Sequence, residues 1–287
     1  MASHDLVLEL VRDLAGYRAC ERIQREVWGF AETAVVPDHL IHMLVHAGGF
    51  LIGAFDGIGP GREMVGYALS CPGLWEGTKL RHHSLMTAVL PGWQDKGVGY
   101  LLKTAQRDHV LRQGIDLITW TFDPLESRNA YFNLNKLGGV VAHYFPSFFG
   151  ELRDTRNKGV PTDRFLLQWH LRSPRVEACL AGGEGPAVPL AQLETINRTQ
   201  KLSSGLRAPG GFQLGLSAPY LLFEIPADFQ VLRKADLELA RQWRMESRPA
   251  LSSYIEEGYV VTSLFRQGDR SFLVLEKAPL ERLLERT

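Results

Sequence analysis

Residues 91–102, PGWQDKGVGYLL, link an apolar, strand-like run to a helix-like run and contain the pattern Gln-x-x-Gly-x-Gly. Glycines at a helix start let the backbone approach a ligand closely. The free N–H groups and the positive end of the helix dipole favour an anion there, most often a phosphate. The spacing matches neither the Walker loop nor the dinucleotide pattern G-x-G-x-x-G. We therefore predict an anion site at the start of a helix over 97–113.

The sequence around this segment predicts a mixed α/β fold. Val98, Leu101, Leu102 and Ala105 would form the apolar face of the helix over 97–113, and Gly114 would end it. Residues 6–14 fit either a strand or the start of a helix. Further helices are expected over 17–30, 37–49 and 127–139. Strands are expected over 50–56, 64–72, 81–91, 116–124, 140–145 and 163–171.

The second half of the chain changes in composition. Residues 173–218 are rich in Gly, Pro, Ser and Ala, which indicates a long connection that could carry one short strand. Residues 219–287 read as a strand, a helical segment with a break at Pro249, and a hairpin. This order repeats that of 117–171, either through a half-domain duplication or because the unit is common. We predict three parts, 1–172, 173–218 and 219–287.

Composition narrows the function classes. The chain has 287 residues, 45% hydrophobic and 22% charged, with a formal net charge of zero. Bulk charge therefore favours neither nucleic acid nor a membrane surface as a partner. No apolar run approaches the ~18–20 residues that cross a bilayer. The three scattered cysteines and the lack of a signal-like N-terminus predict a cytoplasmic protein.

The motif and the element order over about 5–171 resemble the acyl-CoA-binding region of the GNAT superfamily of N-acetyltransferases. The resemblance implies a mixed, mostly antiparallel, twisted sheet flanked by helices, with the tail as an added GNAT-like half-domain. It implies acetyl-CoA or succinyl-CoA as co-substrate, a small-molecule amine acceptor and no metal. The backbone amides that would hold the CoA pyrophosphate are those around Gln94, Lys96, Gly97, Val98 and Gly99.

Further site residues follow from the same resemblance. Ala88 and Val89 would hydrogen-bond the pantetheine arm, and Asn129 would contact its amides. Counting back from Val89 places His83 at the position of a general base, and strand alternation would put His83, Leu85, Thr87 and Val89 on one face. An imidazole is suited to proton transfer near neutral pH.

The general acid is left open. The family commonly places a Tyr four residues before the glycine that ends the second helix, and here that position is Leu134. Tyr131 and Tyr144 are the nearby alternatives, together with solvent. The histidines His39, His42 and His46 fall on one face of the helix over 37–49, but no acidic or Cys partner for a metal accompanies them.

A closer resemblance links stretches in both halves to a bacterial GNAT subgroup with a C-terminal extension. Members are often encoded beside N-acylamino acid racemase or o-succinylbenzoate synthase-type enzymes, which implies an amino acid acceptor and an acetyl or succinyl donor. The carboxylates of such substrates favour arginine, and Arg128 is the first choice. The other candidates are Arg81, Arg153, Arg156 and Arg164.

Two rival functions remain. One is acetyl transfer to a polyamine, an antibiotic or a protein lysine. The other is a non-catalytic acyl-CoA-binding module, which the absence of the usual tyrosine favours. The apolar tail strands would either pack on the main sheet or form a homodimer contact.

Overall fold

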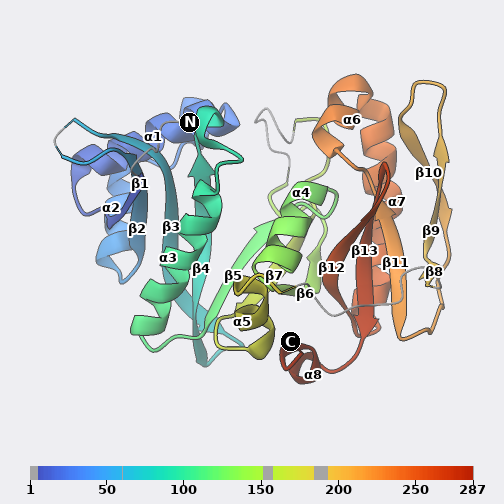
Figure 1. The fold of residues 1–287 in the computed structure, drawn as a ribbon. Helices are drawn as coiled ribbons and strands as arrows, with labels where there is room; N and C mark the ends of the chain where they lie inside the picture. The colour runs from blue at the N-terminus through green and yellow to red at the C-terminus, as the bar shows by residue number, and fades with distance from the viewer. Residues whose placement is uncertain (1–5, 60, 151–157, 184–192, 287) are drawn as a thin grey trace. The chain divides into compact units, whose positions relative to one another are not determined.

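The computed structural model describes residues 6–59, 61–150, 158–183 and 193–286. The chain divides into two compact units, one reaching Trp120 and the other beginning at Thr121. We call them unit 1 and unit 2 and describe each by itself; Figure 1 shows the elements of both.

Unit 1 is an α/β unit whose strands follow the order β1-β2-β3-β4-β5. All neighbours pair antiparallel except β4 and β5, which run parallel. Its strands are β1 (Leu6–Leu10), β2 (Phe50–Asp56), β3 (Glu63–Trp75), β4 (Lys79–Val89) and β5 (Leu117–Phe122), the last of which ends in unit 2. Its helices are α1 (Leu14–Trp28), α2 (Asp38–His46) and α3 (Val98–Arg112), with the short 3₁₀ turns η1 (Glu32–Ala34) and η2 (Pro91–Trp93).

Local signals explain where these elements begin and end. The open choice at the N-terminus resolves into a strand, β1, because the side chain of Asp13 accepts from the Gly16 N–H and caps α1 as a separate helix. Gly29 ends α1 with a φ of 64°, a conformation that favours glycine. Helix α3 begins and ends within a residue of the predicted limits.

A bulge in β4 corrects the predicted strand faces. Ser84 pairs with Ser70 and Met86 pairs with Leu69, so Leu85 is an extra residue in the ladder. After this extra residue, odd-numbered and even-numbered side chains exchange faces of the sheet. His83 therefore shares its face with Met86 and Ala88, and not with Thr87 and Val89 as predicted.

The buried face of α3 also differs from the prediction. Val98 and Leu102 are buried as expected, but Leu101 is 41% exposed. Lys103 and Gln106 take its place in the core. The polar Ser84 on β4 explains the change, since it receives hydrogen bonds from both side chains.

Unit 2 contains a sheet in the order β7-β6-β12-β13-β11-β8 and a separate hairpin, β9–β10. The β6–β7 and β12–β13 hairpins meet antiparallel, with Val261 opposite Val141. Its strands are β6 (Val140–Phe145), β7 (Arg164–His170), β8 (Glu194–Thr195), β9 (Asn197–Lys201), β10 (Arg207–Phe212), β11 (Tyr220–Ile225), β12 (Tyr259–Gln267) and β13 (Arg270–Lys277). Its helices are α4 (Ser127–Ala130), the π-helical η3 (Tyr131–Lys136), α5 (Pro174–Leu180), α6 (Phe229–Ala235), α7 (Leu237–Glu256) and α8 (Leu280–Leu284).

Two predictions for the second half of the chain were wrong. The segment 173–218 holds helix α5 and the strands β8, β9 and β10 instead of one short strand, because Ser173 caps α5 and Pro174 suits its first turn. Helix α7 runs through Pro249 without a break. Pro249 and Met245, whose carbonyl loses its helical partner, both lie on the solvent-exposed side, so water can satisfy that carbonyl.

The predicted fold class, a mixed and mostly antiparallel sheet flanked by helices, is confirmed. The tail forms the predicted strand, helical segment and hairpin, and its β12 pairs with β6. None of the helices described here is long and apolar enough to span a lipid bilayer.

Candidate functional site

Residues 94–99, which follow β4 and extend into the first turn of α3, form an open turn at the start of α3. We call this turn the cradle. Gly97 precedes the helix with a φ of 82°, and its carbonyl accepts the first intrahelical bond, from Leu101 N–H. The N–H groups of Val98 and Gly99 precede that bond and point toward the helix start. A Cβ at Gly97 or Gly99 would meet no atom within 4 Å, and the first turn holds no acidic residue. This combination can accept an anion.

The predicted neighbours Gln94 and Lys96 lie in the same turn. The Gln94 side chain donates to the carbonyl of Val89 (3.0 Å), which fixes the turn to the end of β4. The Lys96 ammonium lies 5.0 Å from the centre of the Trp93 ring. Lys96 therefore has a defined position within the cradle.

Strand β4 has an unpaired edge next to this cradle. It pairs with β5 only at His82 and His83, in register with Ile118 and Thr119. Among the residues that the structure describes, the β5 side of β4 beyond the bulge meets no strand of unit 1. The carbonyl of Val89 is already engaged by the Gln94 side chain, so this edge can offer an extended ligand only its remaining backbone groups.

His83 is held by a neutral partner. Its Nδ1 lies 3.0 Å from Oγ1 of Thr119, which also accepts from Arg81 Nη1 (2.7 Å). Thr119 has a second lone pair that can accept the Nδ1–H of His83. In that tautomer Nε2 keeps its lone pair and can accept a proton or a hydrogen bond.

The pKa of His83 corrects the expectation of an imidazole that titrates near neutral pH. Burial, with the charges of Arg81 and Lys103, lowers its pKa to about 4. The imidazole is therefore neutral at physiological pH and is a weak base. Such a group suits the orientation of an amine or a water molecule better than complete proton removal.

The remaining predicted residues belong to unit 2. Arg128 and Asn129 are exposed on α4, and Tyr131 is 37% exposed at the start of η3. The guanidinium of Arg266 lies 5.5 Å from the Tyr131 ring centre. Leu134, at the usual tyrosine position, is fully buried.

Tyr144 differs from Tyr131 because its hydroxyl is already engaged. It donates to Asp163 (2.5 Å), and burial and the charge of Asp163 raise its pKa. A phenol held in this way is a poor proton donor to a thiolate. Arg164 lies 3.6 Å from Asp123. Arg153 and Arg156 lie outside the described residues.

The structure also places a buried lysine that the sequence pattern did not single out. Lys103 is 3% exposed, and its Nζ donates to Ser84 (2.8 Å) and to Gln106 (3.1 Å). It also lies 3.7 Å from the ring centre of Trp120. Burial lowers the pKa of Lys103 to about 7. Its position one helical turn beyond Gly99, inside an apolar pattern, was the only signal in the sequence.

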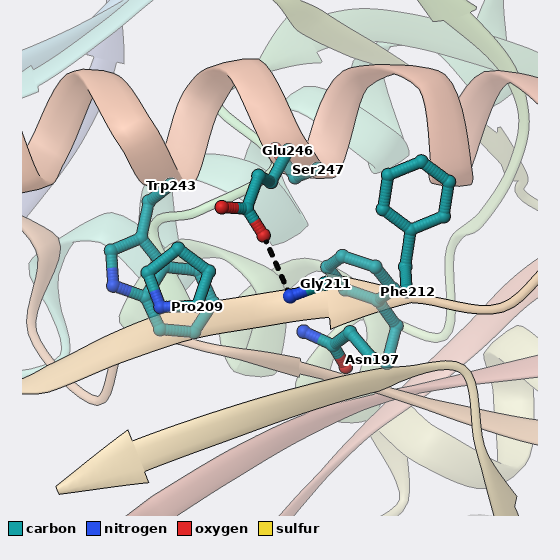
Figure 2. A pocket seen from close by; sticks show the side chains of 8 residues that line it. Asn197, Pro209, Gly211, Phe212, Trp243, Glu246 and Ser247 are labelled. Atoms are coloured by element: carbon teal, nitrogen blue, oxygen red, sulfur yellow. Dashed lines mark hydrogen bonds between the residues drawn. The ribbon is translucent and has the colours of Figure 1, made fainter.

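Two other features fall outside this site. No group of three or more His, Cys, Asp or Glu side chains in the described residues could hold a metal ion, and this holds for the histidines of α2. A shallow hollow lies in unit 2 beside α7 and β10 (Figure 2). Its polar groups are bonded internally: Glu246 accepts from Gly211 N–H (3.0 Å), and Asn197 bonds the backbone of Glu224. We assign this hollow to packing.

Comparison with known proteins gives only structural likeness. No protein-family profile and no curated protein matches the sequence. A GNAT-family protein from Desulfovibrio desulfuricans has 16% identity and a TM-score of 0.45, covering 58% of this chain and 99% of that one. The ribosomal-protein-S18-alanine N-acetyltransferase from Escherichia coli has 11% identity and a TM-score of 0.44, covering 58% and 94%. An aminoglycoside acetyltransferase from an uncultured soil metagenomic sample has 18% identity and a TM-score of 0.38, covering 43% and 82%. Because identities and scores are this low, the proposal below rests on the residues of this chain.

Proposed function

We propose that this chain is an acyl-CoA-dependent N-acyltransferase of the GNAT type. It would transfer an acetyl or succinyl group from CoA to the amino group of a small molecule, an amino acid. The observation that carries this proposal is the open glycine cradle at the start of α3, next to the unpaired edge of β4 that also bears His83. The family resemblance of the Gln-x-x-Gly-x-Gly motif supports it.

Each part of the acyl-CoA has a proposed set of contacts on this chain. The N–H groups around Gly97, Val98 and Gly99 would hold the pyrophosphate, and Lys96 would add a charge-assisted contact. The backbone of Ala88 and Val89 would pair with the pantetheine arm. Asn129 is our candidate for a further contact to the pantetheine amides.

The chemical step is a direct attack of the amine on the thioester carbonyl. The C–N bond forms, the C–S bond breaks, and CoA leaves as a thiolate. His83 would orient the amine, or a water molecule that receives the proton of the amine. An N–H of the strand near Ala88 or Val89 would stabilise the oxyanion. Tyr131 is the better of the two tyrosine candidates for protonating the thiolate, since the Tyr144 hydroxyl is bonded to Asp163.

A non-catalytic acyl-CoA-binding module is the second candidate. It is favoured by the buried Leu134 at the usual tyrosine position and by the low basicity of His83. The two functions differ in a simple way: both bind acyl-CoA, and only the enzyme releases thiol. Acetyl transfer to a polyamine, an antibiotic or a protein lysine is a further alternative within the enzyme class.

The test combines thiol release with a matched pair of variants. Acetyl-CoA and succinyl-CoA are each offered with D- and L-amino acids, polyamines and aminoglycosides. Gly99→Glu places a carboxylate at the cradle, where a Cβ meets open space and an acidic residue favours the helix. Gly99→Gln has the same shape without the charge.

We expect turnover of amino acids by the wild type, and a loss of CoA affinity in Gly99→Glu that is much larger than in Gly99→Gln. Equal CoA affinity in both variants would contradict the proposal that the cradle binds the pyrophosphate of CoA. CoA binding without thiol release for any acceptor would instead support the non-catalytic module.

A further inference from the structure

Arg81 is a partly buried guanidinium in unit 1 that has only neutral partners. Its Nη1 donates to Thr119 Oγ1, and its guanidinium lies 5.1 Å from the ring centre of Trp75. Its Nε is buried without a hydrogen-bond partner. Within the described parts of the chain, no carboxylate forms an ion pair with it. A buried charge without a counter-ion costs free energy, so an arginine in this state favours a bound anion.

The residues around Arg81 lie along one face of the sheet. Arg81 is opposite Gly73 and His83 is opposite Cys71 in the β3–β4 ladder, and His83 is opposite Thr119 in β5. A Cβ at Gly73 would meet no atom within 4 Å. The missing side chain therefore leaves open space opposite Arg81 in the ladder, on the face that carries Arg81 and His83.

Thr119 sets the separation between the two nitrogen-bearing side chains. Arg81 Nη1 and His83 Nδ1 both contact its Oγ1, at 2.7 and 3.0 Å, so they lie within the span of two hydrogen bonds. The amine and the carboxylate of an α-amino acid are joined through a single carbon. A carboxylate on Arg81 would therefore hold an α-amine near His83.

We propose that Arg81 binds the carboxylate of the acceptor and thereby restricts the acceptor to α-amino acids. The proposal deepens the function proposed above and rests on it. Arg81 supplies charge-assisted donors, and Gly73 supplies the space. A polyamine has no group for this guanidinium and places a second positive charge beside it. For this role we propose Arg81 in place of Arg128, the first choice from the sequence.

The experiment compares each proteinogenic L-amino acid and its D-enantiomer with its own carboxamide. The carboxamide keeps the amine and the side chain and removes the negative charge. Thiol release and acceptor binding to the CoA-saturated protein are measured for the wild type, Arg81→Gln and Arg81→Lys. Lys79→Met, an exposed position on the same strand with a side chain 74% exposed, is the control.

We expect the wild type to prefer the amino acid over its carboxamide. Arg81→Gln should lose this preference through a rise of about 10–100-fold in KM or Kd for the amino acid, the range of a charge-assisted hydrogen bond. Its affinity for CoA should not change, and its KM for the carboxamide should change much less than its KM for the amino acid. Arg81→Lys should recover part of the preference, and Lys79→Met should resemble the wild type.

A second variant tests the same site with Arg81 intact. Gly73→Val fills the open space opposite Arg81 on the same face and should weaken amino acid binding without affecting CoA. The proposal is overturned if the wild type does not distinguish amino acid from carboxamide, or if Arg81→Gln keeps the preference. Neither result would contradict the proposed acyl transfer. Absence of thiol release with every acceptor would overturn the proposed function. In that case, comparing amino acid binding to the wild type and to Arg81→Gln would still test whether Arg81 binds the carboxylate.

Discussion

Each unit contains a different arrangement around positive charges that are buried or partly buried. In unit 1, the partners of Arg81 and Lys103 among the described residues are hydroxyl, amide and aromatic groups. In unit 2, Arg244 donates to Asp123 (2.5 Å), and Arg248 donates to Asp163 through Nε and Nη2 (2.9 and 2.7 Å). A paired guanidinium holds the structure together, whereas an unpaired one retains the capacity to bind an anion. The lack of a carboxylate is not sufficient by itself, because the buried Arg175 of unit 2 donates to the backbone carbonyls of Gly138 and Thr262. Arg81 differs from Arg175 because it is partly exposed and its Nε has no hydrogen-bond partner in the described residues.

The titration behaviour follows this difference. Burial lowers the pKa of Lys103 to about 7, since no carboxylate of the described residues offsets the cost. For Arg244 burial also lowers the pKa, but the charge of Asp123 and its hydrogen bond outweigh it and raise the pKa. Burial alone would raise the pKa of Asp163, and the hydrogen bonds from Arg248 and Tyr144 lower it.

The largest expected effect on stability comes from removing the carboxylate of Asp163, which pairs with Arg248. Asp163 is buried and accepts from Tyr144, Arg248 and the Ser147 N–H. Asp163→Asn leaves Arg248 without its counter-ion and should lower the free energy of unfolding by about 3–5 kcal/mol. Because the folded pKa of Asp163 is lowered, this stabilisation is present above the pKa of the unfolded carboxyl and is lost as pH falls through the folded value. Urea unfolding at several pH values measures both effects.

The control for Asp163→Asn is Asp269→Asn, which removes an exposed pair with Lys201. It should leave the urea midpoint nearly unchanged. Equal destabilisation by the two variants would contradict the contrast between buried and exposed pairs.

Removing the unpaired lysine should act in the opposite direction. Lys103→Met keeps the volume and removes a buried charge, so it should raise the free energy of unfolding at pH 6 by about 1–3 kcal/mol. The folded pKa lies below the unfolded value, so the unfolded chain binds more protons between pH 7 and 10, and wild-type stability should rise across that range. In Lys103→Met this rise should disappear, whereas in Lys79→Met it should remain. A destabilised Lys103→Met would show that its bonds to Ser84 and Gln106 outweigh the cost of burial.

A smaller effect is expected from the hydroxyl that joins Arg81 to His83. Thr119→Val removes one neutral acceptor, so kcat/KM for the preferred acceptor should fall by about 2–10-fold. Thr104→Val, whose hydroxyl bonds only the backbone of its own helix, should have no effect on kcat/KM. Unchanged kinetics in Thr119→Val would mean that Thr119 does not position His83 for the reaction.

The smallest effect concerns the titration of His83. Its pKa of about 4 should be visible in an NMR pH titration, and Lys103→Met should raise that pKa because a nearby positive charge is removed. The shift should be well under one pH unit, since burial is the main cause. A wild-type value near 6.5 would show that the imidazole is solvated, and it would restore the expectation of a stronger base.

Much of the fold and part of the site could be predicted from the sequence. The cradle was predictable because a turn, two glycines and a helix start are local features within 94–99. The order of strands and helices up to 171 followed from periodicity and from turn residues. The content of 173–218 was missed, because its Gly and Pro residues interrupt the apolar pattern of the short strands β9 and β10.

The sequence by itself determined the elements that depend on neighbouring residues: the glycine cradle, the caps of the helices, and the position of His83 on the strand before the motif. The tertiary structure alone decided the face on which each side chain lies and the partner of each charge. The bulge at Leu85 arises from the register of β4 against β3. Asp123, the carboxylate partner of Arg244, lies 121 residues away along the chain. Asp163, the partner of Arg248, lies 85 residues away. Such pairings form only when distant segments meet, so no local pattern could show which arginine would remain available.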